Sequence, residues 1–238
     1  MNLLQIDSAS IMNQAMNAFN DAPQEAKMDL LDLAMKGGWI MIPIILLSVV
    51  AIFIYIERFF AIRSAKKENA GFMDRIRDYI HDGKIESALD LCKTTNTPYS
   101  RMIEKGITRL GRPMSDILVA IENVGNMEVA KLEKGLSAVA TVAATAPMIG
   151  FLGTVTGMVT AFFDMSNAGS ALDIGVLSKG IYEALVTTVA GLIVGIIALF
   201  IYNHLVTMVD KVVHKMEART MDFMDLLNEP LVELRVKN

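Results

Sequence analysis

The chain has 238 residues, of which 53% are hydrophobic and 20% are charged, and its formal net charge is −4. This composition is too apolar for an ordinary soluble domain and too charged for a chain that lies wholly in a membrane. A weakly acidic chain gives no reason to expect nucleic-acid binding. A single cysteine excludes an internal disulfide and a cysteine-based zinc cluster.

The N-terminal segment, residues 1–36, has acids and no basic stretch, so it does not resemble a secretory signal. Within it, residues 29–36 are expected to form a short amphipathic helix that lies at the membrane interface. Three later stretches are long enough to cross a bilayer as helices, which takes about 20 residues. These spans are residues 37–57, 135–163 and 180–208.

Lysine and arginine gather at one end of each span, and this asymmetry sets the orientation. The residues concerned are Arg58, Arg63, Lys66, Lys67, Lys131, Lys134, Lys211, Lys215 and Arg219. The positive-inside rule places residues 58–134 and 209–238 in the cytoplasm, and residues 1–36 and 164–179 on the other side of the membrane. We therefore expect an all-α membrane protein with three transmembrane helices and long cytoplasmic helical extensions.

The cytoplasmic region, residues 58–134, has helical spacing of its apolar residues. A first helix from Phe72 is expected to stop at His81-Asp82-Gly83, and a second begins at Ile85 with Cys92 in the core. Thr97-Pro98 has the form of an N-cap with proline in the first helical position, and Gly111 marks the end of that helix. Pro113 starts another helix, which is expected to run unbroken through Glu133 into the second span.

The second span has one face of small residues, and so does part of the third. On the second span these are Ala143, Pro147, Gly150, Thr154, Gly157 and Ala161, at alternating spacings of four and three. On the third span one half has Gly180, Glu183, Thr187, Gly191, Ala198 and Tyr202, with Ala184, Thr188 and Gly195 beside them. Small residues allow close helix approach and threonines hydrogen-bond across it, so helix packing alone explains the glycines and alanines.

Packing does not explain Glu183, which is a carboxylate at the head of an otherwise apolar span. An acid inside a membrane is costly unless it faces a bundle interior or a watery cavity, so it is a candidate functional residue. The alternative is that Glu183 reaches the outer headgroups or pairs with Lys179, one turn away. A ring of subunits could surround a pore lined by Thr154, Glu183, Thr187 and Thr188 and filled by helices of another protein.

Two runs of sequence match a known family. Residues 146–158, APMIGFLGTVTGM, resemble the APxxGLxGTVxGM motif of the MotA/TolQ/ExbB proton-channel family, and residues 180–192, GIYEALVTTVAGL, resemble its GIxEALxxTxxGL motif. Within the family the chain is closest to the ExbB branch, because it lacks the additional span expected of MotA. One departure is Gly195-Ile196-Ile197-Ala198, where family members often have a proline.

The resemblance implies a function in the bacterial inner membrane. ExbB-like subunits form a pentamer around the transmembrane helices of ExbD, and with ExbD they use the proton-motive force to energise TonB-dependent transport across the outer membrane. By position, Thr154 and Thr188 would line the proton route with Glu183 as its acidic wall, while Pro147, Gly150, Gly157, Gly191 and Gly195 would set helix packing and pore shape. The carboxylate that cycles the proton would belong to the partner.

Two alternatives stay open, namely a TolQ-like subunit of the Tol-Pal envelope motor and a non-conducting membrane scaffold. An intramembrane enzyme is disfavoured because Glu183 has no second acid in the spans, no HExxH motif and no intramembrane cysteine beside it. The histidines His81, His204 and His214 have no metal-ligand spacing. Neither a metal site nor a cofactor is expected.

Overall fold

The computed structural model describes residues 37–66, 71–167 and 174–229, and within these residues every regular element is an α-helix, as predicted. The helices are α3 (Met41–Ala65), α4 (Phe72–His81), α5 (Ile85–Thr95), α6 (Pro98–Ile107), α7 (Met114–Glu133), α8 (Leu136–Asn167) and α9 (Ile174–Asn228). The amphipathic helix expected at residues 29–36 lies outside the described residues.

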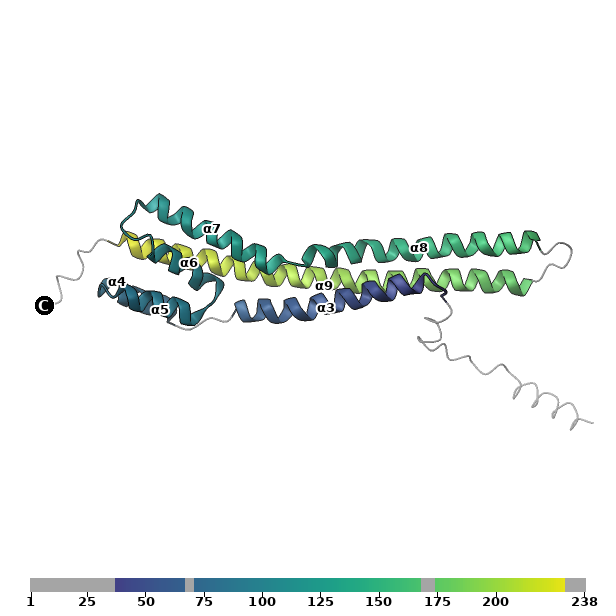
Figure 1. Ribbon diagram of the computed structural model, residues 1–238, viewed down its shortest axis with the longest axis horizontal. Helices are drawn as coiled ribbons and strands as arrows, with labels where there is room; N and C mark the ends of the chain where they lie inside the picture. Colours follow the sequence, from purple (N-terminus) through teal and green to yellow (C-terminus); the bar gives the residue numbers. More distant parts are fainter. Residues whose placement is uncertain (1–36, 67–70, 168–173, 230–238) are drawn as a thin grey trace, which may run out of the picture.

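The axis of the molecule is α9, which extends along almost its whole length (Figure 1). At about 1.5 Å per residue its 55 residues span roughly 80 Å, far more than the ~30 Å core of a bilayer. Helices α3 and α8 pack on its first half, and α4, α6 and α7 pack on its second half. We call the first part the span region and the second part the helical domain.

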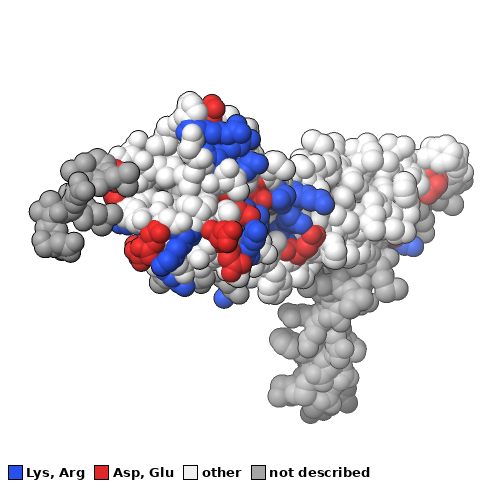
Figure 2. Space-filling view, turned by 60° about the vertical axis from the view of Figure 1, so that its left-hand side comes forward, with Lys and Arg blue, Asp and Glu red and all other residues white. Residues whose placement is uncertain are grey.

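The span region holds the membrane-crossing segments. Three helical stretches are long and apolar enough to cross a membrane, namely Met41–Ala65, Met114–Asn167 and Leu177–Asn228. In Figure 2 the charged side chains gather over one part of the molecule, and the rest of the visible surface is almost free of them. The chain is therefore a membrane protein whose charged helical domain projects beyond the bilayer.

The helices of the domain begin at or next to the residues where the sequence predicted them, although α6 ends at Ile107, four residues before the predicted Gly111. Helix α4 ends at His81, before Gly83, whose φ of 71° suits a residue without a Cβ. Thr97 caps α6 by accepting a hydrogen bond from the Ser100 amide, and the Ser100 hydroxyl oxygen accepts one from the Thr97 amide in return. Cys92 is fully buried in the domain core, as expected.

The prediction of an unbroken helix from Pro113 into the second span is wrong. Helix α7 ends at Glu133 and α8 begins at Leu136, with Gly135 between them at a φ of 85°. Only glycine adopts this left-handed conformation readily, so a single residue turns the chain between the two helices. The helices also extend into the loop predicted at residues 164–179, because α8 continues to Asn167 and α9 already begins at Ile174.

Candidate functional site

Helices α8 and α9 meet along the small-residue faces that the sequence predicted, and we call this contact the seam. A methyl group added to Gly191 would lie 2.6 Å from the carbonyl oxygen of Ala146 and 2.9 Å from the Cα of Gly150. One added to Gly195 would lie 2.5 Å from Cγ of Pro147. Because these neighbours are backbone or a rigid ring, the two helices touch where side chains are absent.

The seam continues toward the loop between the helices. A methyl group on Gly157 would lie 2.9 Å from the Cβ of Ala184, and one on Gly180 would lie 2.6 Å from the Cβ of Ala161. This face is thus occupied inside one subunit. Because α9 of the same chain already covers this face of α8, the face is a contact within one subunit and not one between neighbouring subunits.

Threonine hydroxyls cluster at the centre of the seam around one backbone carbonyl. The hydroxyls of Thr154 and Thr188 hydrogen-bond to each other. Thr188 also donates to the carbonyl oxygen of Gly150 at 3.0 Å, and Thr154 lies 3.3 Å from the carbonyl oxygen of Ala184. The predicted pair is therefore brought into direct contact, with both hydroxyls partly buried between the helices.

Thr187 contributes to the same cluster from the other side. Its side chain is buried, and its hydroxyl donates to the Ala184 carbonyl oxygen at 2.7 Å and lies 3.3 Å from that of Gly150. The Gly150 carbonyl is consequently approached by Thr187 and Thr188 together. Glycine at position 150 leaves this carbonyl open to both hydroxyls, since an added Cβ would lie 2.8 Å from the Thr187 carbonyl oxygen.

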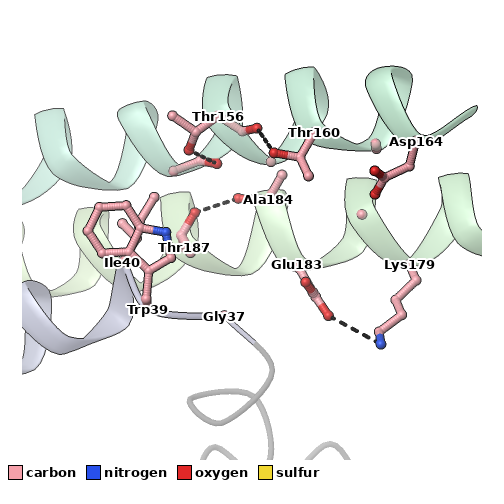
Figure 3. Close-up of a pocket in the computed structure, with 15 residues that line it drawn as sticks. Gly37, Trp39, Ile40, Thr156, Thr160, Asp164, Lys179, Glu183, Ala184 and Thr187 are labelled. Carbon is pink, nitrogen blue, oxygen red and sulfur yellow. Dashed lines mark hydrogen bonds and ion pairs between the residues drawn. The ribbon is translucent and has the colours of Figure 1, made fainter. Parts of the chain in front are cut away.

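Glu183 faces a hollow of about 410 Å³ between α8, α9 and the residues before α3 (Figure 3). Apolar atoms make up most of its surface, and we call it the polar hollow after the charged and threonine side chains that line it. Its carboxylate lies 3.9 Å from Nζ of Lys179, and 39% of the Glu183 side chain is exposed. The ion-pair alternative from the sequence is thus present in the structure, as a long contact between partly exposed side chains. Thr187 lines the same hollow at its deep end.

The four predicted pore-lining residues do not share one surface. Glu183 and Thr187 line the polar hollow, whereas Thr154 and Thr188 do not. Successive residues on a helix are turned by about 100°, so Thr187 and Thr188 approach the Gly150 carbonyl oxygen from different edges of the seam. The start of α3 contacts the Thr187 edge of the seam, which leaves Thr154 and Thr188 on the edge away from α3.

The hollow also contains polar residues that the sequence reading did not single out, namely Thr156, Thr160 and Asp164 of α8. They recur at a spacing of four, which is the signal of one helical face. Asp164 was assigned to the loop because the span was ended at residue 163. Among the described residues no group of three or more His, Cys, Asp or Glu side chains could hold a metal ion.

Comparison with known proteins bears on this arrangement. The profile of the MotA/TolQ/ExbB proton channel family matches residues 94–218. The protein ExbB-like 1 of Synechocystis sp. is 33% identical over 189 residues, which cover 75% of this chain and 71% of that protein. The biopolymer transport protein ExbB of Neisseria meningitidis is 28% identical over 180 residues, covering 70% and 80%. An ExbB homolog of Methanothermobacter thermautotrophicus is 30% identical over 135 residues, covering 57% and 47%.

Proposed function

The chain belongs to the MotA/TolQ/ExbB proton channel family, and from this premise we propose that it is an ExbB-like subunit of a proton-driven motor in the bacterial inner membrane. A pentameric ring of subunits would surround the transmembrane helices of an ExbD-like partner. A TonB-like protein would transmit the energy of the proton-motive force to transporters in the outer membrane. Residues 1–36 would be periplasmic and residues 58–134 and 209–238 cytoplasmic.

The observation that carries the proposal is the set of polar side chains at the seam. Helices α8 and α9 are apolar over most of their outward surface, yet Thr154, Thr187 and Thr188 converge on the Gly150 carbonyl and Glu183 lies one turn away. Polar groups at membrane depth are costly and mark ion and proton pathways. A non-conducting scaffold would need the small residues and would gain nothing from the carboxylate.

The position of α3 supports one orientation of the subunit in the ring. Because α3 covers the Thr187 edge of the seam, the edge with Thr154 and Thr188 is the one available to face a partner at the centre. Thr154 and Thr188 would then line the central pore, and Glu183 would act from the opposite edge. The three relatives are ExbB or ExbB-like proteins, which favours the ExbB branch over TolQ, and a cell-based assay separates the two.

The test is uptake of a TonB-dependent substrate by cells in which variants replace the wild-type chain. Glu183→Ala should abolish uptake, while Glu183→Gln should retain more, because glutamine keeps the shape and hydrogen bonding without the charge. Thr154→Val and Thr188→Val should each impair uptake, since losing a hydrogen bond worth about 1 kcal/mol in the rate-limiting step slows it roughly fivefold.

Assembly of the complex is checked in parallel by purification in mild detergent. Leu185→Ala is the matched control, because Leu185 lies on the same turn as Glu183 and is 55% exposed on the outward surface. If Glu183→Ala and both valine variants took up substrate at the wild-type rate, the proton-conducting function would be excluded and the non-conducting scaffold would remain. Normal uptake together with loss of envelope integrity in the same variants would instead favour the TolQ-like motor.

A further inference from the structure

Two polar stripes face each other across the polar hollow. Thr156, Thr160 and Asp164 are spaced by four on α8, and Lys179, Glu183 and Thr187 are spaced by four on α9. A spacing of four places residues on one helical face. Since the two helices are antiparallel, the charged ends of both stripes lie near the loop between α8 and α9, and the threonine ends lie deeper (Figure 3).

The hollow is lined by small residues along its length and by residues before α3 at the end away from the loop between α8 and α9. Gly153 and Gly157 of α8 and Ala184 of α9 contribute to its lining without filling it. Trp39 and Ile40, at the start of α3, lie beside Thr187 and limit the space there (Figure 3). The hollow therefore runs from Asp164 and Lys179 at the charged end to Thr187 in the hydroxyl cluster of the seam.

The space is large enough for water, and the threonine hydroxyls and carboxylates along the two stripes can hydrogen-bond to it. At roughly 30 Å³ per molecule, a volume of about 410 Å³ holds on the order of ten waters. Thr160 donates to the Thr156 carbonyl oxygen at 3.0 Å, and Thr156 donates to that of Leu152 at 2.8 Å. A hydroxyl that donates in this way still has lone pairs that accept from water, and the carboxylates accept as well.

We propose that the polar hollow is a water-filled vestibule in each subunit, and that Thr156, Thr160 and Asp164 conduct hydrated protons through it to Glu183. This inference rests on the proposed function. A hydronium ion at the charged end of the hollow gives one proton to the Asp164 carboxylate or to a neighbouring water, and becomes a neutral water molecule. The proton then moves from water to water, each water giving up one proton as it gains another, until Glu183 accepts it. No bond other than O–H forms or breaks.

The vestibule ends at the hydroxyl cluster of the seam. Thr187, at its deep end, and Thr188, on the far edge, both reach the same Gly150 carbonyl oxygen, at 3.3 and 3.0 Å. Thr154, bonded to Thr188, completes the far side. The vestibule thus reaches the pore-facing threonines from the side of α3. Each subunit would then have its own water-filled path along which protons enter.

The first test is water access in the assembled complex. Single cysteines replace Thr156, Thr160 or Val159 in a Cys92→Ser background, and whole complexes in cells are treated with a membrane-impermeant methanethiosulfonate. Val159 is the matched control, because it precedes Thr160 and is 63% exposed on the outward apolar surface. Cysteines at 156 and 160 should be modified several-fold faster than a cysteine at 159. Equal rates would overturn the vestibule.

The second test is transport by Thr160→Val, Thr156→Val and Asp164→Asn, with Val159→Ala as the control that transports normally. Each of the three should lower uptake several-fold while the complex assembles. If these variants transport normally and Glu183→Ala does not, the vestibule inference fails and the proposed function stands. If Glu183→Ala also transports normally, the proposed function itself fails.

Discussion

One helix, α9, passes through two parts of the molecule that are packed by different means. In the span region its contact residues are Gly180, Ala184, Gly191, Gly195 and Ala198. In the helical domain they are Leu205, Val209, Val212, Met216, Phe223 and Leu226. The residues that α9 buries change from small to large where the chain leaves the apolar segment.

The surrounding medium explains the change. In water, burying a large apolar side chain is worth about 1.5–3 kcal/mol, so the domain gathers Ile76, Ile103, Ile107 and Ile121 around Phe223. In lipid the tails are as apolar as leucine, and helices associate by close backbone contact and hydrogen bonds. The large apolar side chains of the span region therefore point outward, as Phe200 does, which is 73% exposed.

The largest effect should come from adding bulk to the seam. Gly191→Leu places side-chain atoms against the Ala146 carbonyl and the Gly150 backbone, neither of which can move aside. We expect loss of the monodisperse complex in mild detergent, measured by size-exclusion chromatography. The domain core contains none of these residues, so Cys92, which is fully buried there, should stay protected from thiol reagents.

Cys92 is a suitable probe because burial raises the pKa of its thiol to about 12. Only the thiolate reacts, so the folded domain should be inert at pH 8. Val189→Leu is the control for the seam variant, since Val189 is 48% exposed on the outward side of the same helix. Wild-type elution by Gly191→Leu would contradict the view that backbone contact holds the span region.

Much of the contrast between the span region and the helical domain was predictable from the sequence. The wheel of the second span placed Gly150 and Gly157 on the contact face, and the capping pattern at Thr97 placed α6, because both features depend on local spacing. The turn at Gly135 was not predictable from that spacing. One glycine within a helical pattern is usually tolerated, as Gly125 is inside α7, and no local signal marks Gly135 as the glycine that takes the left-handed conformation.

The separation of the polar residues was missed for a related reason. A helical wheel places Glu183, Thr187 and Thr188 in one half of the third span, but it does not show where a third helix will lie. Helix α3 covers one edge of the seam and so divides that half into two surfaces. The stripe from Thr156 to Asp164 was detectable by its spacing, but the span was ended before Asp164.

A smaller effect is expected from opening the domain core. Phe223 is fully buried on α9, and Phe223→Ala should lower the free energy of unfolding by about 3–5 kcal/mol, because it removes a large side chain and leaves a cavity. The measurement is the rate of Cys92 modification in increasing urea. Phe200→Ala is the control with the same change on the exposed part of the same helix, and it should leave Cys92 protected. Equal sensitivity of the two variants would remove the distinction between the regions.

The smallest effect concerns a charged contact that the domain, in water, can maintain. Glu128 of α7 is buried, hydrogen-bonds to Arg101 of α6, and accepts from Nζ of Lys131 at 2.7 Å. Burial alone raises the pKa of this carboxyl, but the hydrogen bonds and charges of Arg101 and Lys131 outweigh burial and hold the pKa below its usual range. Glu128 therefore stabilises α6 against α7 in its ionised form.

We expect Glu128→Gln to lower the free energy of unfolding by about 1–2 kcal/mol at pH 7, since the charge-assisted hydrogen bonds are weakened while the shape is kept. A depressed folded pKa adds stability above the unfolded value of about 4.3, and this stability is lost as the pH falls through the folded pKa. The urea midpoint of each protein is measured at a series of pH values between 7 and 3, with Cys92 modification as the readout. The difference between wild type and variant should shrink as the pH falls below about 4.3. Glu122→Gln is the control, because Glu122 is exposed on the same helix. A difference between wild type and Glu128→Gln that persisted unchanged at pH 3 would show that the ionised form of Glu128 is not what stabilises α6 against α7.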